Sequence, residues 1–386
     1  MSLRTLGLIA GCDVLAMATW FSASAVIVPL ASAFGIAPGD RGWITATVQF
    51  GFVTAALGSA SIALTDWVEP RTLIRSGMLV AGLANAAIAF VHAPALLLFL
   101  RFLTGAGLAL VYPPTVRLLT GWFPRSRGVV TGIAVGALTI GSFSPHVFSG
   151  DLPWRTVMLV ASGFAFLGIP LMSMVALPPS YQHAGRFDMR AVPAILSNRD
   201  IVLADAGYWG HMWELYAVWA WGPVFYAATL QASHIRAPAG VIVFALFGVV
   251  GAAGCVLAGV LGDRYGRASV AGTALAVSGT VSLCIGWAFG GNPWLVTTLF
   301  ALWGFTVVAD SGQFSAAVTE YADQRYVGTA LTFQMGVGFL ITMVTIWLVG
   351  AVQATAGWGN AFSLLAVGPA AGVYAMIALY RRTRRR

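Results

Sequence analysis

Ionisable side chains interrupt the apolar stretches of this sequence at a few positions. Asp13, Arg101, Glu214 and Asp310 each stand within a run of mostly apolar residues, and His211 precedes Glu214 by three positions. A charged side chain in hydrocarbon costs about 2.5 to 3.5 kcal/mol or more unless it is paired or hydrated. We therefore expect these side chains to face a protein interior, where they can bind a solute or take up and release a proton.

The segment from Asp205 to Trp221, D-A-G-Y-W-G-H-M-W-E-L-Y-A-V-W-A-W, holds the densest set of such residues. On a helix, Asp205 and Glu214 lie on opposite faces, whereas His211 and Glu214 lie about 60° apart. Burial favours the neutral form of a carboxyl group, and a neighbouring histidine can share its proton. We therefore expect proton coupling at Glu214 with His211, and Asp310 is the reserve candidate. The alternative is a hydrogen-bonded pair between helices with no such role.

The composition indicates which elements must position these residues. The 386 residues are 59% hydrophobic and 9% charged, with a mean hydropathy of +0.83, which is too apolar for one water-soluble core. Apolar stretches of about 20 residues, each long enough to cross a bilayer as a helix, follow one another along the chain. The sequence predicts an all-α polytopic membrane protein with twelve helices, near 6–34, 42–64, 75–92, 95–120, 128–149, 155–177, 201–227, 239–261, 268–289, 294–318, 328–352 and 359–380.

The basic residues predict the orientation of the chain. All 21 are arginines, and the net charge is +8. If the N-terminus is cytoplasmic, only Arg41, Arg155 and Arg236 fall outside, while the others, except Arg101 within a helix, lie inside or at the inner interface. This bias predicts that both termini are cytoplasmic and that the inner surface contacts anionic lipids. The first stretch is too long, and lacks the cleavage site, to be a removed signal peptide.

Other functional classes find little support in the sequence. The arginines at 381–386 directly follow a membrane helix, so we expect no nucleic-acid binding. Cys12, Cys255 and Cys284 fall in predicted helices without C-x-x-C spacing, which indicates neither a disulfide framework nor a metal site. No nucleophile–base pair or phosphate-cradling loop is apparent, so we expect no enzyme activity and no cofactor. We also expect a monomer.

A loop motif occurs twice. Gly259 to Arg267 reads G-V-L-G-D-R-Y-G-R, and Ile62 to Arg71 contains a weaker copy, I-A-L-T-D-W-V-E-P-R. The two aspartates are 263 − 66 = 197 residues apart, about half the chain. The motif and its spacing resemble the major facilitator superfamily, whose loop G-x-x-x-D-R-x-G-R joins helices two and three and recurs between helices eight and nine. The helix-seven segment and the compact length also resemble bacterial permeases of the cyanate and nitroimidazole group.

This resemblance implies two pseudo-symmetric six-helix bundles, at 1–177 and 199–386, joined by a cytoplasmic linker at 178–198 with a short amphipathic helix near 186–196. It further implies a secondary transporter of the bacterial inner membrane, working by alternating access with a substrate site between the bundles. The motif loops would then act as a conformational latch of the outward-open state, formed by Asp66, Arg71, Asp263, Arg264 and Arg267. The alternative for these residues is a set of solvated loop charges that fix the topology.

In this family, helices one, four, seven and ten line the cavity. Helix four contains L-F-L-R-F-L-T-G-A-G-L-A, similar to the family pattern R-x-x-Q-G-x-G-A-A, with Thr104 in place of the glutamine. Arg101 would bind backbone carbonyls of helix one or a substrate anion. The candidate cavity residues are Arg101, Asp13, Trp20, Gln49, Tyr112, Tyr208, Trp209, Gln313 and Gln334.

The substrate class stays open at this point. Arg101 favours the uptake of a small organic anion, whereas the carboxyl groups in the membrane favour the efflux of a cationic or neutral amphiphile. A membrane channel or a sensory receptor on the same scaffold is the alternative from another class.

Overall fold

The computed structural model describes residues 3–123, 127–178, 187–323 and 325–384, and within these ranges the chain is helical, with no β-strand. The first half contains α1 (Leu3–Met17), α2 (Ser22–Ala25), α3 (Ile27–Ala33), α4 (Gly42–Ser61), α5 (Leu64–Trp67), α6 (Pro70–Ala87), α7 (Pro94–Ala109), α8 (Tyr112–Trp122), α9 (Arg127–Phe143) and α10 (Trp154–Ser173). The second half contains α11 (Val192–Ser197), α12 (Arg199–Ala232), α13 (Ala239–Val243), α14 (Val250–Tyr265), α15 (Arg267–Ile285), α16 (Pro293–Thr306), α17 (Ser311–Tyr321), α18 (Val327–Ser363) and α19 (Val367–Thr383).

Shorter helical turns extend or connect these helices. They are η1 (Pro38–Asp40), η2 (Ile88–Phe90), η3 (Ser144–Phe148), η4 (Met189–Ala191), η6 (Gly286–Ala288), η7 (Leu364–Ala366) and the π-helix η5 (Phe244–Val249). Together, η4 and α11 confirm the short helix predicted near 186–196, although Arg186 itself lies outside the described residues.

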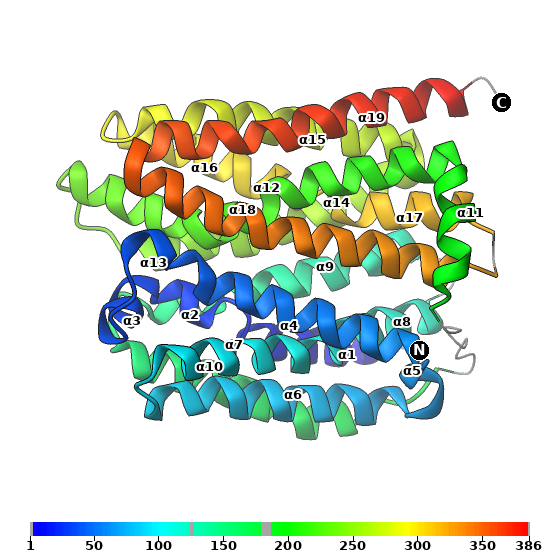
Figure 1. Cartoon of the computed structure of the whole chain (residues 1–386), viewed down its shortest axis with the longest axis horizontal. Helices are drawn as coiled ribbons and strands as arrows, with labels where there is room; N and C mark the ends of the chain where they lie inside the picture. The colour runs from blue at the N-terminus through cyan, green and yellow to red at the C-terminus, as the bar shows by residue number, and fades with distance from the viewer. Residues whose placement is uncertain (1–2, 124–126, 179–186, 324, 385–386) are drawn as a thin grey trace.

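The predicted fold class is confirmed. In the described part of the chain, eight helical segments are long and apolar enough to cross a bilayer, and one of them, Val327–Thr383, has 57 residues. That segment is long enough for two crossings. Gly357, with φ of 77°, breaks it, and α19 runs back along the molecule in the opposite direction to α18 (Figure 1). The protein is therefore an all-helical, multi-pass membrane protein.

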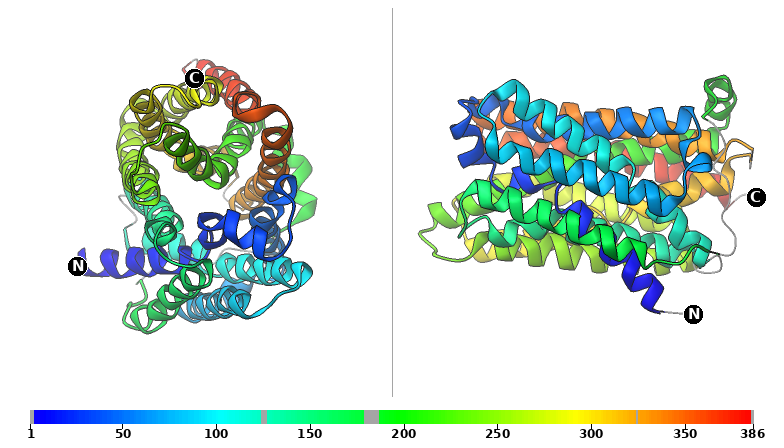
Figure 2. Two further views of the ribbon diagram at one scale, coloured as in Figure 1. Left: turned by 90° about the vertical axis from the view of Figure 1, so that its left-hand side faces the viewer. Right: turned by 90° about the horizontal axis from the view of Figure 1, so that it is seen from below.

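Both chain ends, α5 and α11 lie at one end of the molecule, which we call the terminal face (right in Figure 1). The opposite end, which carries α3 and α13, is the distal face. Helices of the first half pack mainly on one another, as do those of the second half. The main contacts between the halves are α4 with α18 and α9 with α14. Seen along the helices (Figure 2, left), the first half lies below the second.

Several predicted helices are broken near their middle. The first stretch is interrupted between Met17 and Ser22, helix four between α7 and α8, and helix ten between α16 and α17. In helix four, Pro113 and Pro114 follow the break, because proline lacks the N–H that would continue the helix. Breaks of this kind free backbone carbonyls within the membrane, and these must find partners in the protein interior.

Candidate functional site

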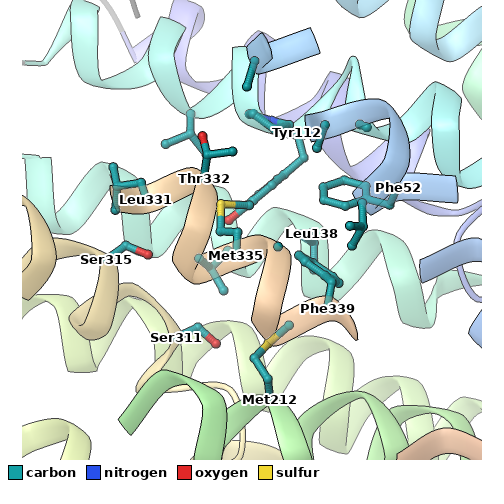
Figure 3. Close-up of a pocket in the computed structure, with 18 of the residues that line it drawn as sticks. Phe52, Tyr112, Leu138, Met212, Ser311, Ser315, Leu331, Thr332, Met335 and Phe339 are labelled. Atoms are coloured by element: carbon teal, nitrogen blue, oxygen red, sulfur yellow. The ribbon is translucent and has the colours of Figure 1, made fainter. Parts of the chain in front are cut away.

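A cavity of about 340 Å³ lies between the two halves. It is lined by α4, α8, α9, α12, α17 and α18, and the side chains seen in Figure 3 include Phe52, Tyr112, Leu138, Met212, Ser311, Ser315, Leu331, Thr332, Met335 and Phe339. Ala60 at the end of α4, Gly328 at the start of α18 and Phe187 before α11 also line it, so the cavity extends to the terminal face. The walls are mostly apolar, with a few hydroxyl groups and the side chains of Arg117 and His211.

Aromatic rings close the cavity toward the distal face. Phe52 and Phe339 have ring centroids 4.7 Å apart, Trp20 lies 4.9 Å from Phe52, and Tyr216 lies 5.3 Å from Phe339. Trp219 extends the cluster, with its centroid 5.4 Å from that of Tyr216. We call these five residues the aromatic plug. Because both halves supply rings to it, the plug can open only if the halves separate at this level.

One buried pair of ionisable groups reaches the cavity wall. His211 Nδ1 lies 2.8 Å from Asp310 Oδ1, and His211 Nε2 lies 2.9 Å from Ser311 Oγ. The side chains of His211 and Asp310 are 2% and 1% exposed, and His211 and Ser311 line the cavity. Asp310 stands in the break between α16 and α17, which places it opposite α12. An imidazole held by a carboxylate beside a cavity can serve as a proton acceptor and donor.

Glu214 has different neighbours from those expected. Its Oε1 accepts a hydrogen bond from Trp303 Nε1 at 2.8 Å, and its Oε2 accepts one from Ser278 Oγ at 2.8 Å. Glu214 thus lies among α12, α15 and α16 and does not line the cavity. The expected contact between Glu214 and His211 is therefore wrong. The angle of about 60° between them on α12 is wide enough to turn Glu214 toward α15 and α16 and His211 toward Asp310 and Ser311.

Arg101 is fully buried and also lies away from the cavity. Its guanidinium donates to the carbonyl oxygens of Thr19 at 3.1 Å and Ile44 at 3.3 Å, to that of Trp20, and to Asn85 Oδ1 at 3.1 Å. Of the two expected partners, the structure places the backbone carbonyls of the first helix at this arginine. The break after α1 exposes these carbonyls, and Arg101 satisfies them.

Comparison with known proteins identifies the family. A family model described as Major Facilitator Superfamily matches residues 9–335. The chain belongs to this family. The 4-hydroxybenzoate transporter PcaK of Pseudomonas aeruginosa is 24% identical over 367 residues, covering 84% of this chain and 80% of PcaK. The 3-(3-hydroxy-phenyl)propionate transporter of Escherichia coli is 27% identical over 380 residues, covering 92% and 88%.

A third relative, the cephamycin export protein CmcT of Amycolatopsis lactamdurans, is 27% identical over 199 residues, covering 48% of this chain and 40% of CmcT. Like other members of the Major Facilitator Superfamily, the protein is a secondary transporter of small organic solutes. The alternative of a channel or receptor is not favoured, because these relatives carry the names of transport proteins.

The other candidate cavity residues of this family member are placed as follows. Tyr112 and Tyr208 line the cavity, whereas the remaining candidates, Asp13, Trp20, Gln49, Trp209, Gln313 and Gln334, do not. Gln334 Nε2 donates to Asp205 Oδ1 at 2.9 Å, and Gln334 O accepts from Trp209 Nε1 at 3.2 Å. These side chains therefore join helices instead of facing the solute space.

Asp13 and Gln49 are fully buried, and their side chains have no hydrogen-bond partner among the described residues. Gln313 Nε2 donates to Ala258 O at 3.0 Å, which ties α17 to α14. Together with Arg101, Trp20, Trp209 and Gln334, these residues bring to seven the number of the nine candidates that do not line the cavity.

At the second motif loop, Arg267 donates to Asp263 at 2.5 Å, to Gln313 at 3.2 Å and to Glu320 at 3.3 Å. The carboxylate of Asp263 lies against Gly128 of the first half, since a Cβ built there would be 2.9 Å from its oxygens. The loop thus touches both halves at the terminal face. Arg264 stacks over Tyr265, with its Cζ 5.2 Å from the ring centroid.

The first motif loop differs from the expectation. Arg71 pairs with Glu69 and donates to Val175 O at 3.1 Å, whereas Asp66 lies 3.6 Å from Arg117. The expected pair of Asp66 with Arg71 is therefore wrong. Between the two residues, α5 ends at Trp67 and α6 starts at Pro70, so Arg71 lies in the first turn of α6 and reaches Val175, just after α10.

The sequence did not reveal several residues of the cavity. Ser311, Thr332 and Met335 line it, and Phe52 and Phe339 belong to the aromatic plug. The run D-S-G after Ala309 is a signal for Ser311, because serine and glycine beside a buried aspartate favour a break in the helix. Phe52, Met335 and Phe339 resemble ordinary lipid-facing or core residues, so periodicity cannot distinguish them.

Proposed function

We propose that this protein is a proton-coupled transporter of small aromatic carboxylates across the bacterial inner membrane, and that it carries out transport and not catalysis. Among the relatives that align over most of the chain, the two described above are named for a hydroxybenzoate and a hydroxyphenylpropionate, which are single aromatic rings bearing a carboxylate. Another, from Chlamydia pneumoniae, is named a probable hexose phosphate transport protein. The observation that carries the proposal is the His211–Asp310 pair at the wall of an aromatic-lined cavity.

The cavity suits a substrate of this size and kind. Its volume of about 340 Å³ is near the lower end of the roughly 300–1,000 Å³ typical of small-molecule sites. Phe52 and Phe339 offer ring faces and edges on which an aromatic substrate can stack. Hydroxyl groups of Ser311 and Thr332 line the same space and can hydrogen-bond a phenol or a carboxylate.

The charge of the His211–Asp310 pair supplies a reason for coupling. With a neutral imidazole and an ionised carboxylate the pair carries one negative charge, which repels an anionic substrate at close range. One added proton makes the pair neutral, and the imidazolium can then donate from Nε2 to Ser311 Oγ, which leaves the Ser311 hydroxyl free to donate toward the cavity. Substrate anion and proton therefore bind together, and both leave together when the site faces the other side of the membrane.

The direction of opening follows from the arginine distribution. The arginine bias favours a cytoplasmic location of the terminal face. The cavity then opens toward the cytoplasm and is closed toward the other side of the membrane by the aromatic plug, which is an inward-facing state. The bundles at 1–177 and 199–386 would then rock about the α4–α18 and α9–α14 contacts. The 178–198 linker connects them on the cytoplasmic side.

The proposal is tested in vesicles reconstituted with the purified protein and loaded at a higher pH than the outside. Labelled 4-hydroxybenzoate is expected to accumulate. His211→Gln is expected to abolish accumulation and to weaken exchange, because it leaves the negative charge of Asp310 in place. Asp310→Asn removes that charge and is expected to abolish accumulation while retaining exchange of internal for external substrate. Aromatic amines and hexose phosphates serve as alternative substrates under the same gradient. Accumulation of an amine and exclusion of the carboxylate would reject the substrate class.

Glu214→Gln provides the matched control, because Glu214 is three residues from His211 on the same helix but does not line the cavity. We expect this variant to keep gradient-driven accumulation within about threefold of wild type, since amide and carboxyl differ little in size. Full accumulation in His211→Gln together with its loss in Glu214→Gln would move the coupling site to Glu214.

A further inference from the structure

A second pocket, of about 320 Å³, lies on the outside of the second half at the terminal face. It is formed by the start of α12 and the end of α19, and its lining residues are Arg199, Tyr374, Ile377, Ala378, Arg381 and Arg382. Three of the six are arginines. The transport cavity is lined by other residues, so the two sites are separate.

One of these arginines is fixed in place by an acid. Arg382 Nε donates to Asp200 Oδ1 at 2.6 Å, and the side chain of Asp200 is 3% exposed. Arg199 and Arg381 are exposed and have no acidic partner within the described part of the chain. The pocket therefore carries an excess of positive charge that an anion can neutralise.

An apolar stripe on α19 leads into this pocket. Val367, Tyr374 and Ile377 are 61%, 75% and 46% exposed, and Ala370 and Ala371 lie exposed between them. Spacings of three and four residues place these side chains on one face of the helix. Because α19 belongs to a segment long and apolar enough to span the membrane, this outer face contacts acyl chains.

We propose that the arginine pocket binds the phosphate head group of an anionic phospholipid whose acyl chains lie along the stripe on α19. Guanidinium groups bind phosphate through paired N–H donors, and arginines at the membrane surface attract anionic lipids. The bound lipid would join the start of α12 to the end of α19. The same helix α12 carries His211 further along its length. This inference rests on the family's membrane location and not on the proposed substrate.

The test is native mass spectrometry of the full-length protein titrated with phosphatidylglycerol or with phosphatidylcholine of the same chains. Wild type is expected to retain one phosphatidylglycerol in preference to phosphatidylcholine. The double variant Arg199→Gln/Arg381→Gln is expected to bind phosphatidylglycerol about thirty-fold more weakly, because two surface arginines are lost. Arg382 is left unchanged so that Asp200 keeps its partner.

The matched control is Arg4→Gln/Arg75→Gln, which removes two exposed arginines from the starts of α1 and α6. Its affinity for the lipid is expected to stay within about twofold of wild type. An equal loss in both double variants would overturn the proposal in favour of diffuse charge attraction. If the pocket variant does not fold, Arg381→Gln alone is measured, with an expected weakening of about fivefold.

Inorganic phosphate and glycerophosphoglycerol distinguish a lipid site from a simple anion site. Neither is expected to displace phosphatidylglycerol at millimolar concentration, because both lack the acyl chains that contact α19. Displacement by phosphate as effective as that by the lipid itself would reject the lipid site.

Discussion

The two faces of this transporter are held together in different ways. At the distal face, Gly240 of α13 touches the backbone of η3, since a Cβ built on it would be 1.9 Å from His146 O. On the other side of the same face, a Cβ on Gly42 would be 2.9 Å from Ile346 O. At the terminal face the halves also approach through backbone, since a Cβ on Gly259 would be 2.9 Å from Gly128 O, but here the carboxylate of Asp263 lies against Gly128 as well.

This difference teaches how each face responds to change. At the distal face the backbone of one half packs directly on the backbone of the other. This contact is possible only where there is no side chain between them, and it does not depend on charge. A carboxylate beside the first turn of α9 is attracted by exposed N–H groups and the helix dipole, so the terminal contact depends on charge and can be tuned. Steric substitutions are therefore expected to act most strongly on the distal face, and charge substitutions on the terminal face.

The largest effect is expected from Gly240→Ala. The added methyl group overlaps His146 O, and a backbone carbonyl within a packed turn cannot move aside as a flexible side chain can. We expect the distal-closed state to lose about 3 kcal/mol or more, which shifts the population toward opening at the distal face. Spin-label distances between Asp151 and Gln231, both exposed, measure this shift after the three native cysteines are replaced.

Gly39→Ala is the control for this substitution. Gly39 lies in η1 at the same face, and a Cβ built on it meets nothing within 4 Å. Its distance distribution is expected to match wild type. Identical distributions in Gly240→Ala and Gly39→Ala would show that the distal seal does not depend on this contact.

The sequence predicted the fold better than the contacts. Apolar stretches and the repeated loop were enough to predict the helices and the family, because a bilayer constrains the length and composition of each crossing. The contact at Gly240 could not be predicted, because it joins residues 146 and 240 across the two halves. The sequence contains 45 glycines, and nothing in it indicates which of them contacts the backbone of another helix.

The candidate site illustrates the same limit. Helical geometry correctly placed His211 and Glu214 near each other on α12, yet it could not show which neighbour each would meet. Asp310 reaches His211 because the helix is interrupted between α16 and α17, and that break depends on packing as much as on local sequence. Arg101 was expected to find either carbonyls or an anion, and only the break after α1 distinguishes these alternatives.

A smaller effect is expected from Asp263→Asn, which removes charge and keeps size. The variant loses the 2.5 Å pairing with Arg267 and the attraction to the start of α9. We expect the equilibrium to shift toward a wider terminal face by about 1 to 3 kcal/mol. The shift should be nearer the lower value, because the side chain of Asp263 is 46% exposed. Labels at Arg75 and Arg325 measure it, and an unchanged distribution rules out the latch.

The smallest effect is expected from Asp66→Asn, the equivalent substitution in the first motif loop. Asp66 lies 3.6 Å from Arg117, which belongs to the same half, whereas Asp263 lies against a residue of the other half. A partly exposed pair at this distance contributes about 0.2 to 1 kcal/mol. We therefore expect little change in the terminal-face distances and a small loss of thermal stability. A widening as large as that of Asp263→Asn would show instead that both motif loops act as latches. The terminal face would then be held closed by charged side chains at two positions, Asp66 and Asp263.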